Sequence, residues 1–75
     1  MADFNYDITE EVAVLSEKNG WSKEVNWISY NGAPPKIDIR TWSTDEDGNK
    51  RMGKGITLTK EEAMELRDAL GEIDF

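Results

Sequence analysis

The sequence predicts an α+β protein in which a twisted four-stranded antiparallel sheet is followed by one C-terminal helix. Four segments rich in β-branched and aromatic residues are separated by short turns, and the last segment runs into a helix-start signal. Strands joined by short turns form an antiparallel meander. Because the chain has 75 residues and no repeat or linker, we expect one domain over residues 1–75.

The first two strands are predicted on either side of a tight turn. Hydrophobic residues alternate in part from Phe4 onward, which indicates a strand centred on Ile8 to Ser16. Asn19 and Gly20 both tolerate positive φ and form a strong hairpin signal. The second strand is expected over residues 21–30, and Gly32 with two prolines ends it.

The third and fourth strands are predicted over residues 36–43 and 50–58. Alternation in the third strand separates two faces: Ile37, Ile39 and Thr41 on one, and Lys36, Asp38, Arg40 and Trp42 on the other. We expect the isoleucine face to be the core, so that Arg40 points away from it. In the fourth strand, Gly53 and Gly55 allow a bulge or a close backbone approach.

A helix is predicted to begin after Thr59, because Thr59 and Glu62 have the spacing of a capping box. A narrow apolar seam then recurs at helical spacing, at Ala63, Leu66, Leu70 and Ile73. Gly71 should end the helix. We expect the helix to cover part of one face of the sheet. Whether the seam contacts its own sheet or a second copy is left open.

Composition excludes several classes of chemistry. The chain has no cysteine and no histidine, which removes disulfides, thiolate and imidazole catalysis and most zinc sites. The segment Met52–Gly55 lacks the rest of a phosphate-binding P-loop, and residues 45–56 lack the spacing of a calcium loop. We therefore expect no enzymatic activity, metal, cofactor or small-molecule substrate.

No apolar run approaches the roughly 20 residues that span a membrane, and the acidic N-terminus does not look like a signal peptide. These features predict a cytoplasmic protein without a membrane partner.

The net charge of −7 is unevenly distributed. Residues 18–60 carry eight cations and five acids, for a net +3, whereas the two ends together carry −10. Because the local field decides where phosphates dock, the middle of the chain can still attract nucleic acid. Charge alone favours the simpler interpretation of a soluble acidic protein.

Aromatic and basic residues on a sheet are typical of proteins that hold single strands without a sequence code. The candidate stacking residues are Trp21, Trp27 and Trp42, and the candidate phosphate contacts are Lys23, Lys36, Arg40 and Lys54. Two alternatives stay open. A tryptophan can be a core residue instead, and for Trp27 the core and the stacking interpretations are equally supported. Arg40 can pair with Asp38 instead of binding phosphate. The roles of Lys50 and Arg51 are not assigned.

The chain resembles the transcriptional coactivator family of positive cofactor four, in particular its small bacterial YdbC-like members. The resemblance lies in the run Ile37–Arg40, in the nearby Trp42 and in the run Met52–Thr59. It implies a homodimer, formed by helices and adjoining strands, that binds single-stranded DNA at a bacterial nucleoid. It also implies that Arg40 and Lys54 contact nucleic acid.

Two functions of different classes follow from the sequence. The first is sequence-tolerant binding of single-stranded DNA or RNA by a homodimer, in transcription, replication or repair. The second is a protein-interaction module that uses exposed aromatic residues and an acidic surface and binds no nucleic acid.

Overall fold

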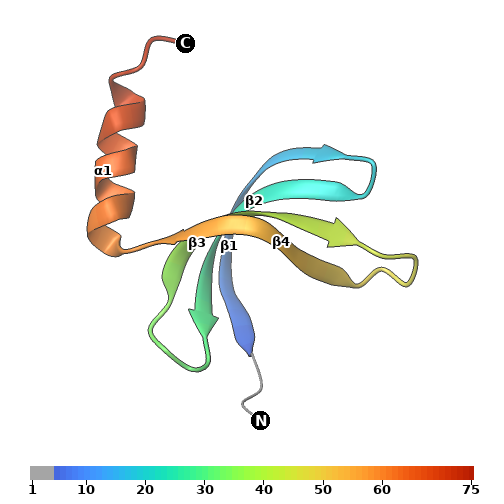
Figure 1. Cartoon of the computed structure of the whole chain (residues 1–75). Helices are drawn as coiled ribbons and strands as arrows, with labels where there is room; N and C mark the ends of the chain where they lie inside the picture. The colour runs from blue at the N-terminus through green and yellow to red at the C-terminus, as the bar shows by residue number, and fades with distance from the viewer. Residues whose placement is uncertain (1–4) are drawn as a thin grey trace.

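The computed structural model describes residues 5–75 and has the predicted order of four strands and one helix (Figure 1). The strands lie in sequence order in one antiparallel sheet. Phe4, where the partial hydrophobic alternation begins, lies outside the described residues. The elements are β1 (Tyr6–Lys18), β2 (Trp21–Tyr30), β3 (Lys36–Thr44), β4 (Lys50–Leu58) and α1 (Lys60–Gly71).

Two Asn-Gly pairs turn the chain between strands. Asn19 and Gly20 have φ angles of 51° and 80°, which confirms the predicted tight hairpin between β1 and β2. Asn31 and Gly32 repeat this conformation, with φ angles of 52° and 78°. Short polar residues and glycine enter this left-handed region most easily, so local sequence fixes both reversals.

The core lies on the face of the sheet that was predicted to be exposed. Five of the six buried residues in the described part of the chain share this face, which we call the inner face: Glu24, Asn26, Ile28, Asp38 and Trp42. The sixth is Ser29. The opposite face, called the outer face, carries Ile37 and Ile39, and both are only half-buried. The prediction of an isoleucine-lined core is therefore wrong.

Strong coiling of the sheet explains this inversion. Tyr6 pairs with Tyr30 at one end of the first hairpin, whereas Trp42 pairs with Ser22 near its other end. Even so, the rings of Tyr6 and Trp42 lie with their centroids 5.8 Å apart. The sheet must therefore curl until its inner face closes on itself. Side-chain alternation separates two faces but does not say which one becomes concave.

The helix begins and ends as predicted but does not cover the sheet. Glu62 N donates to Thr59 Oγ1 over 3.1 Å, and Thr59 N donates to Glu62 Oε1 over 2.8 Å, so the capping box is present. Within the described chain, α1 buries none of its side chains. It leads away from the sheet in Figure 1, leaving Leu66 36 % and Leu70 46 % exposed. The expectation that it covers part of one face of the sheet is wrong.

The chain is more open than a self-contained protein of its size. Its accessible surface is 5987 Å², whereas a compact 8.5-kDa protein exposes about 4,700 Å². Its radius of gyration is 13.8 Å, against about 11 Å for a compact domain of this length. Apolar surface that a compact fold would cover is thus left in contact with solvent.

Replacing the buried tryptophan should cost far more stability than replacing an exposed one. Trp42 is 1 % exposed and Trp21 is 52 % exposed. We expect Trp42→Ala to lower the free energy of unfolding by about 3–5 kcal/mol, because it leaves a large cavity. Trp21→Ala is the matched control and should change it by less than about 0.5 kcal/mol. Urea unfolding at one protein concentration measures both; equal costs would contradict the placement of the core.

Candidate nucleic-acid interface

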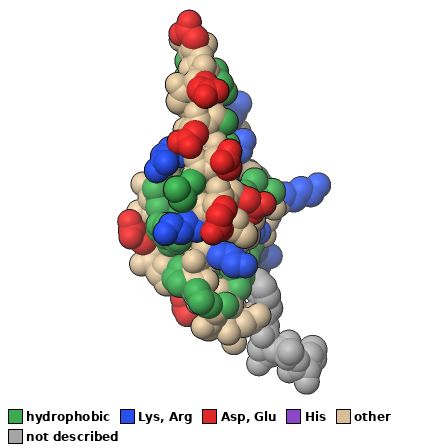
Figure 2. All heavy atoms as spheres, turned by 90° about the vertical axis from the view of Figure 1, so that its left-hand side faces the viewer, with side chains coloured by type: hydrophobic (Ala, Val, Ile, Leu, Met, Phe, Trp, Pro, Cys, Tyr) green, Lys and Arg blue, Asp and Glu red, His purple; other side chains and the backbone are tan. Residues whose placement is uncertain are grey.

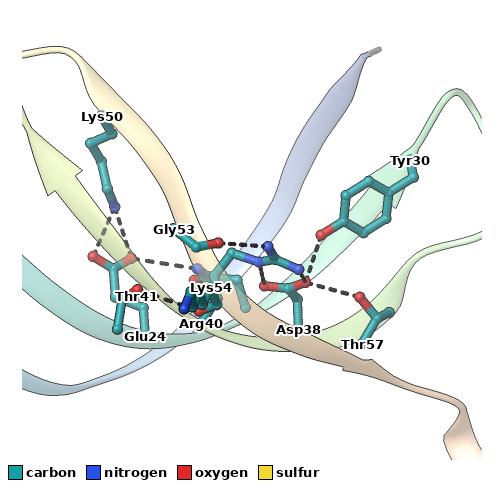
Figure 3. A network of polar contacts seen from close by, with 10 residues as sticks. Glu24, Tyr30, Asp38, Arg40, Thr41, Lys50, Gly53, Lys54 and Thr57 are labelled. Atoms are coloured by element: carbon teal, nitrogen blue, oxygen red, sulfur yellow. Dashed lines mark hydrogen bonds and ion pairs between the residues drawn. The ribbon is translucent and has the colours of Figure 1, made fainter.

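Asp38 is the centre of a polar network on the inner face (Figure 3). Its carboxylate is fully buried and accepts two hydrogen bonds from Arg40, from Nε over 2.6 Å and from Nη2 over 2.7 Å. Tyr30 Oη donates to it over 2.5 Å and Thr57 Oγ1 over 3.1 Å. The third guanidinium nitrogen, Arg40 Nη1, donates to the carbonyl of Gly53 over 3.1 Å. The network joins β2, β3 and β4.

Hydrogen bonding in this network outweighs the cost of burying a charge. Burial by itself raises the pKa of the Asp38 carboxyl, but donors from Arg40, Tyr30 and Thr57 and the charge of Arg40 bring that pKa below its ordinary 3.8. Burial and the hydrogen bond to Asp38 raise the pKa of Tyr30 above 10.0. The pair is therefore ionised at neutral pH, with Tyr30 present as a donor.

A second network on the inner face holds the start of β4 against β2. Lys50 Nζ lies 2.8 Å from both carboxylate oxygens of Glu24, and Ser22 Oγ donates to the same carboxylate over 2.5 Å. Burial raises the pKa of Glu24, but these donors bring it below 4.5. The Lys50 ammonium also lies 5.0 Å from the centroid of the Trp42 ring. Lys50 thus has a structural role that the sequence left unassigned.

Two of the predicted contact residues, Arg40 and Trp42, belong to this inner face. The expectations that Arg40 points away from the core and that the Trp42 ring is exposed are wrong, since the Arg40 side chain is only 14 % exposed and Trp42 is 1 % exposed. The alternative pairing of Arg40 with Asp38 is confirmed. The Trp42 Nε1 donor has no partner among the described residues. Charged neighbours suggested exposure, but these charges neutralise each other inside the fold.

The outer face near the hairpin tips gathers the other candidates. Trp21 is 52 % exposed, and Lys23, on the same face of β2, pairs with Thr41 of β3. Thr41 in turn donates to the carbonyl of the exposed Lys54 over 3.3 Å. Arg51, not assigned from the sequence, pairs with Ser43 next to Trp21 and keeps its side chain 74 % exposed. We call this set the basic strip: Trp21, Lys23, Arg51 and Lys54.

The other half of the outer face is apolar. Strand register aligns Val25 with Ile39 and Ile56, and Trp27 with Ile37 and Leu58. Most of these residues are half-buried, and Ile56 is 56 % exposed. These six residues, called the apolar half, adjoin the start of α1. Trp27 thus lies among hydrophobic neighbours rather than among cations.

Lys36 lies apart from the basic strip. It pairs with Ile28, whereas Trp21 pairs with Ser43 at the opposite end of β3. Seven residues of strand, about 23 Å along the chain, separate those two positions. Of the predicted phosphate contacts, Lys23 and Lys54 are brought together, and Lys36 and Arg40 are placed elsewhere. Strand register determines which of these cations lie together, and the register could not be inferred from the sequence.

Other kinds of site are less well supported. In residues 5–75, no group of three His, Cys, Asp or Glu side chains is placed to hold a metal ion. No helix in the described part of the chain has the length and apolar character needed to cross a membrane. A hollow of about 420 Å³ opens beside Trp21, Gly20 and Thr44, between the two hairpin tips.

Comparison with known proteins identifies the family of this chain. The family described as Transcriptional Coactivator p15 (PC4) matches residues 17–69, and the chain belongs to this family. It is also similar to an uncharacterized protein of Treponema pallidum (strain Nichols), with 49 % identity over 74 residues. That alignment covers 97 % of this chain and 84 % of the relative.

The two buried carboxylates should make the fold sensitive to acid. Because the pKa values of Asp38 and Glu24 are lowered in the folded state, their contribution is complete above their ordinary values of 3.8 and 4.5. It is lost as the pH falls through the lowered values. The free energy of unfolding in urea, measured from pH 7 to 2.5 at fixed protein concentration, should therefore fall below about pH 4.5.

Substitution of Asp38 separates this effect from general acid destabilisation. Asp38→Asn should cost about 3–5 kcal/mol at pH 7, because it leaves Arg40 buried without its counter-charge. The part of the acid dependence that comes from Asp38 should also disappear. If the variant does not fold, Glu24→Gln provides the same comparison at the second carboxylate. A wild-type stability that stays flat down to pH 2.5 would contradict the assigned networks.

Proposed function

We propose that this chain binds single-stranded DNA through the basic strip, as a homodimer and without a sequence code. The observation that carries the proposal is an exposed tryptophan ring next to exposed cations on one face of the sheet. Bases stack on an aromatic ring whatever their identity, and cations follow the phosphates of the same strand. Trp21 would stack, and Lys23, Arg51 and Lys54 would contact phosphates.

The charge distribution supports this placement. Figure 2 shows acidic side chains spaced along the helix. Residues 18–60, which include β2, β3 and β4, instead carry eight cations against five acids. The overall net charge of −7 should weaken long-range attraction to DNA. Contacts within the basic strip act at short range, where the local excess of cations determines the field.

Family membership supports the same function. Proteins of this family bind single-stranded DNA and act as coactivators rather than as enzymes. A role in transcription, replication or repair at a bacterial nucleoid, with RNA as a second possible strand, agrees with a sequence-tolerant site. The protein-interaction alternative predicts instead a folded protein that ignores oligonucleotides.

The apolar surfaces support dimerisation. The apolar half of the outer face adjoins α1, whose hydrophobic residues Met64, Leu66 and Leu70 are all exposed. The chain exposes about 1,300 Å² more than a compact protein of its mass, more than the roughly 800 Å² that each partner buries in a standard interface. A second copy that covers α1 and the apolar half would also place Trp27 in the interface.

Binding should be specific for single strands and should depend on the basic strip. Fluorescence titration with oligo(dT), in competition with a duplex of equal length, should show tighter binding of the single strand, because duplex bases are already stacked. Trp21→Ala should weaken binding by about 1–3 kcal/mol with little change in salt dependence.

Two lysine variants provide a matched comparison for this prediction. Lys23→Ala should make the slope of log K against log salt shallower by about 0.7, the share of one phosphate on a single strand. Lys36→Ala removes the same side chain at the far end of β3 and should leave the slope unchanged. Equal affinity for duplex, or equal effects of the two substitutions, would count against the basic strip.

The dimer should depend on the exposed face of α1. Leu66→Glu puts a charge where desolvation opposes burial, so the variant should sediment as a folded monomer at micromolar concentrations at which the wild type is a dimer. Glu65→Gln, at the neighbouring position on the same helix, is the control and should leave the dimer intact. A wild type that sediments as a monomer throughout the micromolar range would exclude the dimer.

A further inference from the structure

Gly53 and Lys54 form a bulge in β4, next to the paired Gly55, and β3 holds this bulge from both faces of the sheet. The pairing of β3 with β4 is irregular between Arg40 and Trp42, where the bulge lies opposite Thr41. Arg40 Nη1 donates to the carbonyl of Gly53 over 3.1 Å, and Thr41 Oγ1 donates to the carbonyl of Lys54 over 3.3 Å. Two consecutive carbonyls of the bulge are therefore tied to two consecutive side chains of β3 (Figure 3).

The glycines on either side of Lys54 let the two strands approach closely. A Cβ atom at Gly53 would overlap Thr41, and one at Gly55 would overlap the Cβ of Arg40. Only residues without a side chain fit there while β4 stays against β3. The bulge therefore has a fixed geometry, and Lys54 is its one member that carries a side chain.

Arg40 has little capacity left for a ligand. All three guanidinium nitrogens donate hydrogen bonds inside the fold, to Asp38 and to Gly53. Asp38 is itself fixed by hydrogen bonds from Tyr30 and Thr57. The buried carboxylate therefore holds the guanidinium from one side, and Arg40 Nη1 points at the bulge. Two of the five N–H groups of the guanidinium remain for a phosphate, and the side chain that carries them is only 14 % exposed.

We infer that Arg40 and Thr41 are positioning residues for Lys54. They hold the bulge so that Lys54 lies in the basic strip as a phosphate contact, and Arg40 acts through the Gly53 carbonyl without touching nucleic acid. This inference rests on the proposed single-strand binding. It differs from the role that the resemblance implied for Arg40, in which the guanidinium itself binds the strand.

Substitution of Thr41 tests the inference without changing any charge. Thr41→Val keeps the β-branched shape and removes the hydrogen bond to the Lys54 carbonyl. We expect the slope of log K for oligo(dT) against log salt to become shallower by up to about 0.7, the share of one phosphate contact. Lys54→Ala should then change the slope by less in the Thr41→Val variant than it does in the wild-type protein. Thr9→Val is the control: it removes a hydroxyl that donates to the Trp27 carbonyl over 3.3 Å, outside the bulge and its network, and should leave the slope unchanged.

Substitution of Arg40 separates positioning from direct contact. Arg40→Lys keeps the positive charge but loses the fork that joins Asp38 to Gly53. If Arg40 positions Lys54, Arg40→Lys should make the slope shallower, as Lys54→Ala does. The double variant with both substitutions should then change the slope by less than the sum of the two single changes. If Arg40 contacts the strand directly, Arg40→Lys should leave the slope unchanged, because the charge is kept. The slope change of the double variant should then equal the sum of the two single changes. Thermal melts show that each variant is folded at the temperature of the titration, and Thr41→Val carries the test alone if Arg40→Lys is not.

The outcomes distinguish this inference from the proposed function. If the wild type does not bind oligo(dT), single-strand binding and the role of Lys54 are both excluded. If the wild type binds and neither Thr41→Val nor Arg40→Lys alters the slope, only the positioning role is excluded. The positioning role is supported if both variants have a shallower slope and if the slope change of each, combined with Lys54→Ala, is smaller than the sum of the single changes.

Discussion

The arrangement of this protein depends on one buried ion pair, Asp38 with Arg40. An ionised carboxylate can be taken out of water only when strong donors replace the lost solvation, and here Arg40, Tyr30 and Thr57 supply them from three strands. The pair lies on the inner face, the one that closes on itself, although the outer face carries more isoleucine. The same guanidinium fixes the bulge in β4, so the interaction that joins the strands also shapes the surface opposite.

Burial of the inner face leaves the outer face exposed. The outer face divides into the basic strip near the hairpin tips and the apolar half beside α1. A surface with exposed cations and an aromatic ring suits a single strand of nucleic acid, and an apolar surface next to an uncovered helix suits a second copy of the chain. One twisted sheet can thus serve both contacts, because they use different halves of its outer face.

The sequence predicted the elements well and their packing poorly. The Asn19-Gly20 turn, the capping box at Thr59 and the glycines of β4 have local causes, so their positions could be inferred from neighbouring residues. The burial of Trp42 and the pairing of Arg40 depend on coiling that brings Tyr6 to Trp42, which no local pattern encodes. Strand register likewise separated Lys36 from Lys23 and Lys54. For the same reason Arg51 could be placed in the same row of the sheet as Trp21 only once the pairing of β2, β3 and β4 was known.

Nucleic acid is expected to meet the outer face at the hairpin tips and not the inner face. The three tryptophans report on it directly, because each indole N–H gives its own signal in a nitrogen-edited NMR spectrum. On titration with oligo(dT), the Trp21 signal should shift in proportion to binding, while the signal of the buried Trp42 should stay in place. A Trp42 signal that moves as far as that of Trp21, or a Trp21 signal that stays fixed while the strand binds, would contradict the account.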